Sequence, residues 1–174
     1  MQIRIRATGQ VLLQHEWEKW VAQTYFKSLS GITEEVVNRF ESDIVLEGPQ
    51  ATGGTVYQYS QRDGVEQLDG KWYTKYILGP VFTDQAASEI QPAKTAAEQE
   101  AAYKTQKDAE QAASVRKSRT EMLNDCDWTQ IADSTADKTA WATYRQALRD
   151  VPAQAGFPWA IVWPNDPNWV EPIV

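Results

Sequence analysis

Residues 92–124 read PAKTAAEQEAAYKTQKDAEQAASVRKSRTEMLN, and this stretch decides much of the fold. After Pro92 it contains no Gly or Pro, and it is rich in Ala, Gln, Glu and Lys, which are strong helix formers. Proline suits the first turn of a helix, because its missing N–H would have no helical partner there. We therefore predict one continuous helix over 92–124, roughly 50 Å long at about 1.5 Å per residue.

The first half of this predicted helix lacks a sustained apolar stripe. Its best apolar positions are Ala97, Ala101, Tyr103 and Ala109. We expect this half to pack little against its own chain. One interpretation is a solvated helical spacer. Self-association through the helix is the other, although a coiled coil would need apolar a and d positions over about three or more heptads.

Residues 1–83 carry mixed signals that predict a small α+β domain. Isoleucines alternate with arginines in residues 3–6, which is the pattern of a half-buried strand. Trp17 and Trp20 are three residues apart, with Val21 next, as on one face of an amphipathic helix. A second helix is expected to begin at Thr33, whose hydroxyl can cap its first turn.

Two Asp-Gly pairs, at 63–64 and 69–70, separate three runs with strand-like composition. These runs cover residues 55–61, 65–68 and 71–78. Asp-Gly readily takes the positive φ values of a tight hairpin turn. The pattern predicts a three-stranded β-meander, preceded by another strand at 43–47.

The C-terminal part contains a second clear helix signal and then a Pro- and Trp-rich end. Trp141, Tyr144 and Leu148 mark one face of a helix expected at 138–150. Residues 157–164, FPWAIVWP, are bounded by prolines, so we expect them to be extended. In an extended chain four large apolar groups would share one face: Phe157, Trp159, Ile161 and Trp163.

These signals together define the expected organisation, and the expected fold class is α+β. Residues 1–83 form a small α+β domain with a β-meander, and residues 84–124 form a linker and the long helix. Residues 125–174 form a small helical domain with an extended Trp/Pro-rich tail. Five of the eight tryptophans are expected in cores because of their apolar neighbours: Trp17, Trp20, Trp72, Trp128 and Trp141.

Charge and composition exclude several functional classes. The formal net charge is −7, and no basic run could displace the counterions of a phosphate backbone, so we expect no nucleic-acid partner. No stretch approaches about 18 apolar residues, and the first residues lack an apolar signal-peptide core, so we expect no membrane partner and synthesis in the cytoplasm.

The residues that could carry chemistry are few. Cys126 and His15 are the only thiol and imidazole, and Cys126 is flanked by Asp125 and Asp127, whose charge disfavours a thiolate. One Cys and one His cannot build a Cys/His zinc site. We therefore expect no catalytic residue, no metal and no cofactor. The expected role of Asp127 is to cap a helix.

Three motifs in residues 116–164 carry a resemblance to a known family. They are Asp127-Trp128-Thr129, the stretch Tyr144-Arg145-Gln146-Ala147-Leu148-Arg149-Asp150, and Phe157-Pro158 followed by Trp163-Pro164. In this order and spacing they resemble the phage tail assembly chaperone domain at the C-terminus of tail-fibre assembly proteins. The resemblance implies a chaperone that helps to fold or attach fibre proteins, with tail-fibre or other tail proteins as partners in the host cytoplasm. A structural component that stays in the tail fibre or baseplate is the alternative.

Candidate partner-binding residues lie within and just beyond these motifs. They are Phe157, Trp159, Trp163, Trp169, Arg145 and Arg149. Tryptophan is enriched at binding hot spots, so the tail tryptophans could hold a partner. They could equally fold back over the helices as a lid. The two arginines could pair with a partner's carboxylates, or inside the domain with Asp150 or Asp133.

Overall fold

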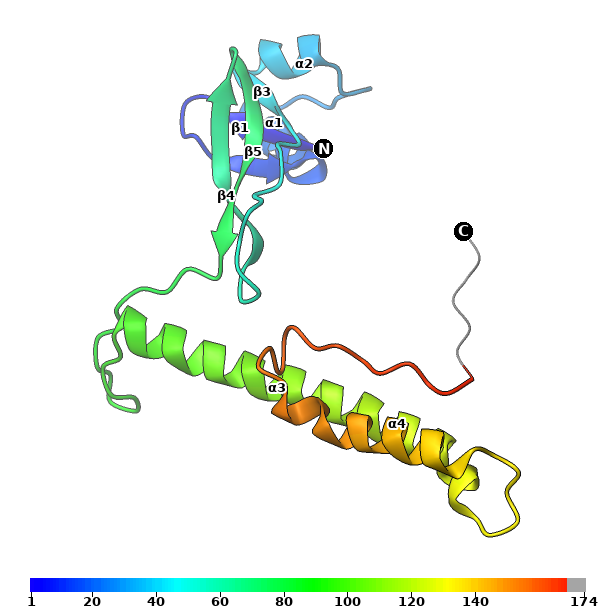
Figure 1. The fold of residues 1–174 in the computed structure, drawn as a ribbon. Helices are drawn as coiled ribbons and strands as arrows, with labels where there is room; N and C mark the ends of the chain where they lie inside the picture. The colour runs from blue at the N-terminus through cyan, green and yellow to red at the C-terminus, as the bar shows by residue number, and fades with distance from the viewer. Residues whose placement is uncertain (169–174) are drawn as a thin grey trace. The chain divides into compact units, whose positions relative to one another are not determined.

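The computed structural model describes residues 1–168, and the chain divides into two compact units, Met1–Val81 and Phe82–Val174 (Figure 1). Helices and strands both contribute, so the predicted α+β class is confirmed. The first unit contains β1 (Gln2–Ile5), β2 (Val11–Leu13), α1 (Gln14–Tyr25), α2 (Glu34–Arg39), β3 (Ser42–Leu46), β4 (Tyr59–Leu68) and β5 (Lys71–Gly79). The second contains α3 (Ala96–Asp125), η1 (Asp127–Gln130), α4 (Lys138–Asp150) and η2 (Val151–Ala153).

The five strands form one mixed sheet in the order β2-β1-β3-β5-β4. Strand β1 pairs antiparallel with both β2 and β3. Strand β3 pairs parallel with β5 over only two positions, Val45 with Trp72 and Leu46 with Tyr73. Strands β4 and β5 form a long antiparallel hairpin at the edge of the sheet.

This hairpin differs in two respects from the predicted meander: β4 begins at Tyr59 rather than at residue 55, and the first Asp-Gly pair is not a turn. Asp69 and Gly70 form the expected turn, with φ values of 49° and 77°. At Asp63-Gly64 the chain instead continues as one strand, with a bulge between Arg62 and Val65. Only Gly64 has a positive φ there, at 79°. A tight Asp-Gly turn needs positive φ at both central residues, whereas a bulge needs it at the glycine alone.

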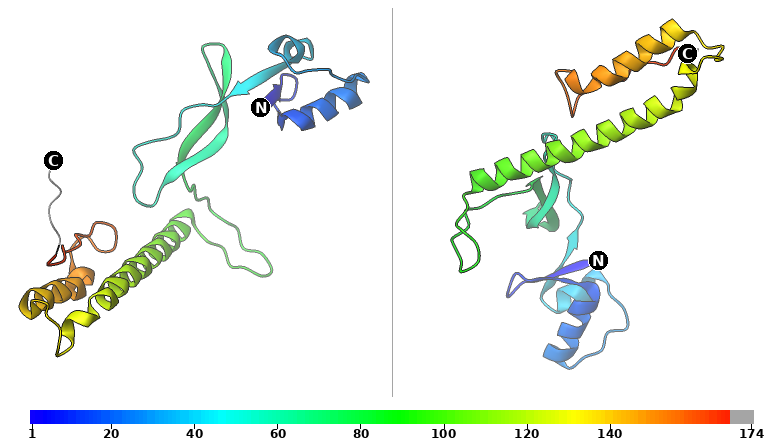
Figure 2. Two further views of the ribbon diagram at one scale, coloured as in Figure 1. Left: turned by 90° about the vertical axis from the view of Figure 1, so that its right-hand side faces the viewer. Right: turned by 90° about the horizontal axis from the view of Figure 1, so that it is seen from below.

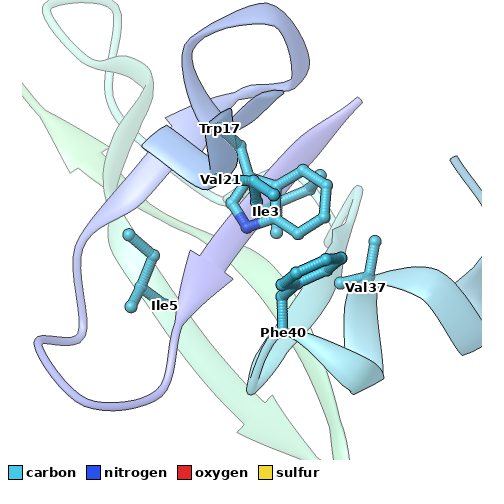
Figure 3. Close-up of a cluster of buried hydrophobic side chains, with 6 residues drawn as sticks. All are labelled: Ile3, Ile5, Trp17, Val21, Val37 and Phe40. Atoms are coloured by element: carbon cyan, nitrogen blue, oxygen red, sulfur yellow. The ribbon is translucent and has the colours of Figure 1, made fainter. Parts of the chain in front are cut away.

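The core of the first unit lies between the sheet and helices α1 and α2 (Figure 3). Ile3 and Ile5 of β1 belong to the same buried cluster as Trp17 of α1, as their alternation and helical spacing predict. The Trp17 indole packs edge-on against Phe40, with 5.9 Å between ring centroids. Its Nε1–H donates to Ser42 Oγ at 3.0 Å, so the one polar group of the buried ring has a partner.

The second unit is built on α3, which is continuous over 30 residues as predicted. The helix begins after Thr95 rather than near Pro92, because Thr95 and Glu98 form a reciprocal capping box. Its first half contains no buried residue, and the buried positions, Ala112 and Val115, lie in its second half. The first half nevertheless contacts its own chain, because Tyr103 packs against Phe82 with 5.5 Å between ring centroids and Gln99 donates to the Thr83 carbonyl at 2.7 Å.

Helix α4 has the predicted bounds, and the Asp137 carboxylate caps its first turn by accepting from the N–H groups of Thr139 and Ala140. In both views of Figure 2, α4 runs back alongside the second half of α3. The seam between them contains Ala112, Val115, Trp141 and Leu148, with Val151 of η2 at its end. The two helices therefore form a helical hairpin, closed by residues 126–137.

Candidate partner-binding site

Arg145 fixes the closed end of the helical hairpin. Its guanidinium donates to the carbonyl oxygen of Leu123 at 2.7 Å and to Cys126 Sγ at 3.0 Å. It also pairs with the Asp127 carboxylate at 2.7 Å. Burial by itself would lower the pKa of Arg145, but the hydrogen bonds to Asp127 and Cys126 outweigh it and raise the pKa above its ordinary value. Arg145 therefore joins α4 to the C-terminal end of α3.

The internal partner of Arg145 differs from the two expected ones. Neither Asp150 nor Asp133 pairs with it; Asp127 does, from the first turn of η1. Asp127 therefore acts through an ion pair, and η1 has no side-chain cap. Arg149, one turn farther along α4, is exposed and forms no ion pair within residues 1–168. Its predicted role in partner binding stays a prediction.

The tail after α4 is compact where we expected an extended strip. Residues 154–160 form successive turns, in which Phe157 N–H donates to Gln154 O and Ala160 N–H donates to Gly156 O at 2.7 Å. A Cβ on Gly156 would lie 1.9 Å from the Ala160 carbonyl oxygen, so this close approach requires glycine. The alternation of Phe157, Trp159, Ile161 and Trp163 therefore does not produce a single apolar face.

Two of the tail candidates contact α3 of their own chain. The Trp159 indole N–H donates to Asp108 Oδ1 at 2.6 Å. The Arg116 guanidinium lies 5.2 Å from the centre of the Phe157 ring. Both contacts agree with the lid interpretation of the tail. Trp163 is half-buried, and Trp169 lies outside the described residues.

Two hydrogen bonds between the Gln154 side chain and the Val162 main chain hold the tail in this compact conformation, and the sequence did not predict them. The Gln154 side chain donates to the Val162 carbonyl at 2.8 Å and accepts from the Val162 N–H at 2.7 Å. These two bonds satisfy both backbone groups of Val162, whose own side chain is 76% exposed. No sequence signal distinguishes Gln154 from an ordinary polar surface residue.

The turn at the closed end of the hairpin exposes large apolar side chains. Trp128 is 51% exposed and Ile131 54% exposed, so the prediction that Trp128 lies in a core is wrong. Thr129, between them, is fully buried, and its hydroxyl donates to the Cys126 carbonyl at 2.7 Å. With Thr129 turned inward, its neighbour Trp128 lies half in solvent. One face of Trp128 still packs edge-on against the buried Trp141, at 6.0 Å between ring centroids.

Cys126 has a structural position in this turn. It is 3% exposed, its thiol donates to the Leu123 carbonyl at 3.2 Å, and its sulfur accepts from Arg145.

Within residues 1–168 no group of His, Cys, Asp and Glu side chains is arranged to hold a metal ion. No helix of this described part is long and apolar enough to cross a membrane.

Comparisons with known proteins find a family that the second half of α3, α4 and the tail resemble. Residues 112–168 match the family model of the phage tail assembly chaperone protein, over about a third of the chain. No curated protein and no solved structure matches the chain. The matched segment begins at the first buried residue of α3 and includes η1, α4 and the described tail. This C-terminal segment is similar to the phage tail assembly chaperone family.

Proposed function

We propose that the chain is a chaperone that binds a tail-fibre protein in the host cytoplasm and helps it to fold or to attach to the tail. One observation carries the proposal. The segment that matches the family contains the closed end of the helical hairpin, where Trp128 and Ile131 are exposed. Exposed tryptophan on a fixed base is typical of a surface that binds other proteins.

The geometry of the hairpin suits a protein that binds its client without catalysing a reaction. A chaperone of this kind covers apolar surface on its client until that surface is buried in the finished assembly. The anchors must hold their positions while the client folds, and here Arg145 and Thr129 fix the turn by hydrogen bonds to main-chain oxygens of α3 and of residue 126. Cys126 is buried behind Arg145, and His15 belongs to the other unit, so we propose a non-catalytic role.

Co-expression tests this proposal. The tail-fibre gene of the same phage would be expressed alone, with the wild-type chain, and with a chain truncated after residue 111, which removes the matched segment. We expect soluble, assembled fibre, measured by size-exclusion chromatography with light scattering, only with the wild-type chain. Equal yields of assembled fibre in all three cultures would contradict the proposal.

A structural component of the tail fibre or baseplate is the second candidate function. The observation that favours it is the first half of α3, where four turns of helix contain no buried residue and could lie along another tail protein or a second copy of the chain. Mass spectrometry of purified particles separates the two candidates. Stoichiometric amounts of the chain would support the structural role, and its absence from particles would support a chaperone that leaves after assembly.

A further inference from the structure

The exposed turn of the hairpin is acidic as well as partly apolar. Between Asn124 and Lys138 the sequence contains four aspartates and no Lys or Arg. We name the exposed large apolar residues and unpaired carboxylates of this turn, which are Trp128, Ile131, Asp125 and Asp133, the turn surface. All four residues are exposed.

The four aspartates of this turn differ in what they do for the fold. Asp127 pairs with Arg145, and Asp137 caps α4 through two hydrogen bonds. Asp125 and Asp133 are exposed and form no ion pair within residues 1–168. Their negative charges are therefore available to a partner and flank the two exposed apolar side chains in the sequence, Asp125 before Trp128 and Asp133 after Ile131.

This arrangement matches the anatomy of a small protein-binding surface. Hot spots are commonly large aromatic anchors surrounded by a polar rim that excludes water. The anchor here has a fixed orientation, because the Trp128 ring packs against Trp141, which in turn packs edge-on against Tyr144 at 5.6 Å. A partner thus meets a preorganised apolar group, which lowers the conformational entropy lost on binding.

The charge of the rim selects the chemistry of the partner. Complementary charges speed association and reject wrong partners more than they add affinity. Two unpaired carboxylates in the same short turn as an apolar anchor favour a segment that carries Lys or Arg and disfavour an acidic one. The chain as a whole has a net charge of −7, so a second copy of it is a poor match for this rim.

We propose that the turn surface binds a short segment of the client tail protein in which a large apolar side chain is flanked by Lys or Arg. This inference rests on the proposed chaperone function and names the part of the client that the chaperone holds. Trp128 supplies the main apolar contact, Ile131 extends it, and Asp125 and Asp133 face the basic side chains.

An array of overlapping peptides covering the tail-fibre protein of the same phage tests the proposal. The full-length chain is applied to the array, and the affinity and rates for the tightest peptide are then measured by surface plasmon resonance. We expect that peptide to combine aromatic or aliphatic residues with Lys or Arg. Trp128→Ala should weaken its binding by about 30-fold or more, as truncation of a hot-spot residue does.

Matched variants separate the apolar and the charged contributions. Asp125→Asn combined with Asp133→Asn should slow association about threefold or more at low salt, and this difference should disappear at high salt. Trp128→Phe keeps an aromatic ring on Trp141 and should recover most of the affinity. Ile90→Ala is the control, because Ile90 is 89% exposed yet lies outside the family segment, and it should leave binding unchanged.

Each outcome has a separate meaning. If the wild-type chain binds neither the peptides nor the intact fibre, the proposed function itself fails. If it binds them and Trp128→Ala binds equally well, the chaperone function stands and the turn surface is not the binding site. If Trp128→Ala loses helical structure by circular dichroism, Trp128→Phe and the double asparagine variant test the proposal in its place. If the association rate of the double asparagine variant depends on salt in the same way as that of the wild type, the proposal is overturned. Preference for an acidic peptide would overturn it too.

Discussion

Replacing Arg145 with alanine should open the closed end of the helical hairpin. The Arg145 side chain is 11% exposed, and it reaches the Leu123 carbonyl, Cys126 Sγ and the Asp127 carboxylate at 2.7, 3.0 and 2.7 Å. No other described side chain makes hydrogen bonds to all three. The variant therefore leaves a half-buried carbonyl, a buried sulfur and a carboxylate without this shared donor.

The structure sets the size of the effect. Losing the hydrogen bonds from the charged guanidinium costs about 1.5–3 kcal/mol, while the Leu123 carbonyl keeps the Cys126 thiol as a donor. The ion pair adds only about 0–1 kcal/mol, because Asp127 is 63% exposed and can be rehydrated. Taking the middle of each range, we expect a total of about 2–3 kcal/mol. This raises the open population of the hairpin end about 30- to 150-fold, since about 1.4 kcal/mol is a factor of ten.

Hydrogen exchange read by mass spectrometry measures this opening. Peptides from α4 should exchange about 30- to 150-fold faster in Arg145→Ala than in the wild type, while peptides from α1 in the other unit should not change. Asp127→Asn is the matched control, because it removes the exposed carboxylate and keeps the cation, and it should change α4 exchange by less than about fivefold. If the two variants exchange alike, the hydrogen bonds to α3 do not hold the hairpin and our reasoning is refuted.

Three further predictions address other parts of the chain. Ser42→Ala should lower the free energy of unfolding of the first unit by about 1–3 kcal/mol in urea titrations, because the buried Trp17 indole N–H loses its acceptor; an unchanged midpoint would contradict this. Gly156→Ala should disrupt the tail turn against the Ala160 carbonyl, seen as faster exchange in tail peptides with α1 unaffected, and unaltered tail exchange would show that the turn can relax. Hydrogen bonds from the Thr95 main-chain N–H, and then from the Thr95 hydroxyl, lower the pKa of Glu98. The stabilisation from these bonds is therefore complete above the pKa of an unfolded glutamate and is lost as pH falls through the lower folded value. An NMR titration midpoint for Glu98 at or above that of free glutamate would disprove this prediction.

The positions of helices α3 and α4 in the sequence could be predicted because they depend on local composition. Helix α4 has the predicted bounds, since its cap, its apolar face and its end all lie within residues 137–150. The start of α3 was predicted too early. Thr95 and Glu98 carry the capping-box spacing, and this local signal determines the first turn more strongly than the position of Pro92.

The candidate site was less predictable because its contacts join distant parts of the chain. The pairing of Arg145 with Asp127 depends on how α4 returns along α3, which composition does not specify. Trp128 looked like a core residue, and its exposure follows from the inward hydrogen bond of Thr129. The compact tail depends on a single close approach at Gly156, which a Pro- and Trp-rich sequence does not indicate.

Hydrogen-exchange footprinting of the full-length chain with and without the purified tail fibre is the most direct test of the account. We predict slower exchange on binding in peptides from residues 112–168, strongest in the turn that contains Trp128 and Ile131. Peptides that avoid this segment, including those of the first unit, should exchange as in the free chain. Protection confined to residues 1–81, or no protection at saturating fibre, would contradict the claim that this helical hairpin is the client-binding part of the protein.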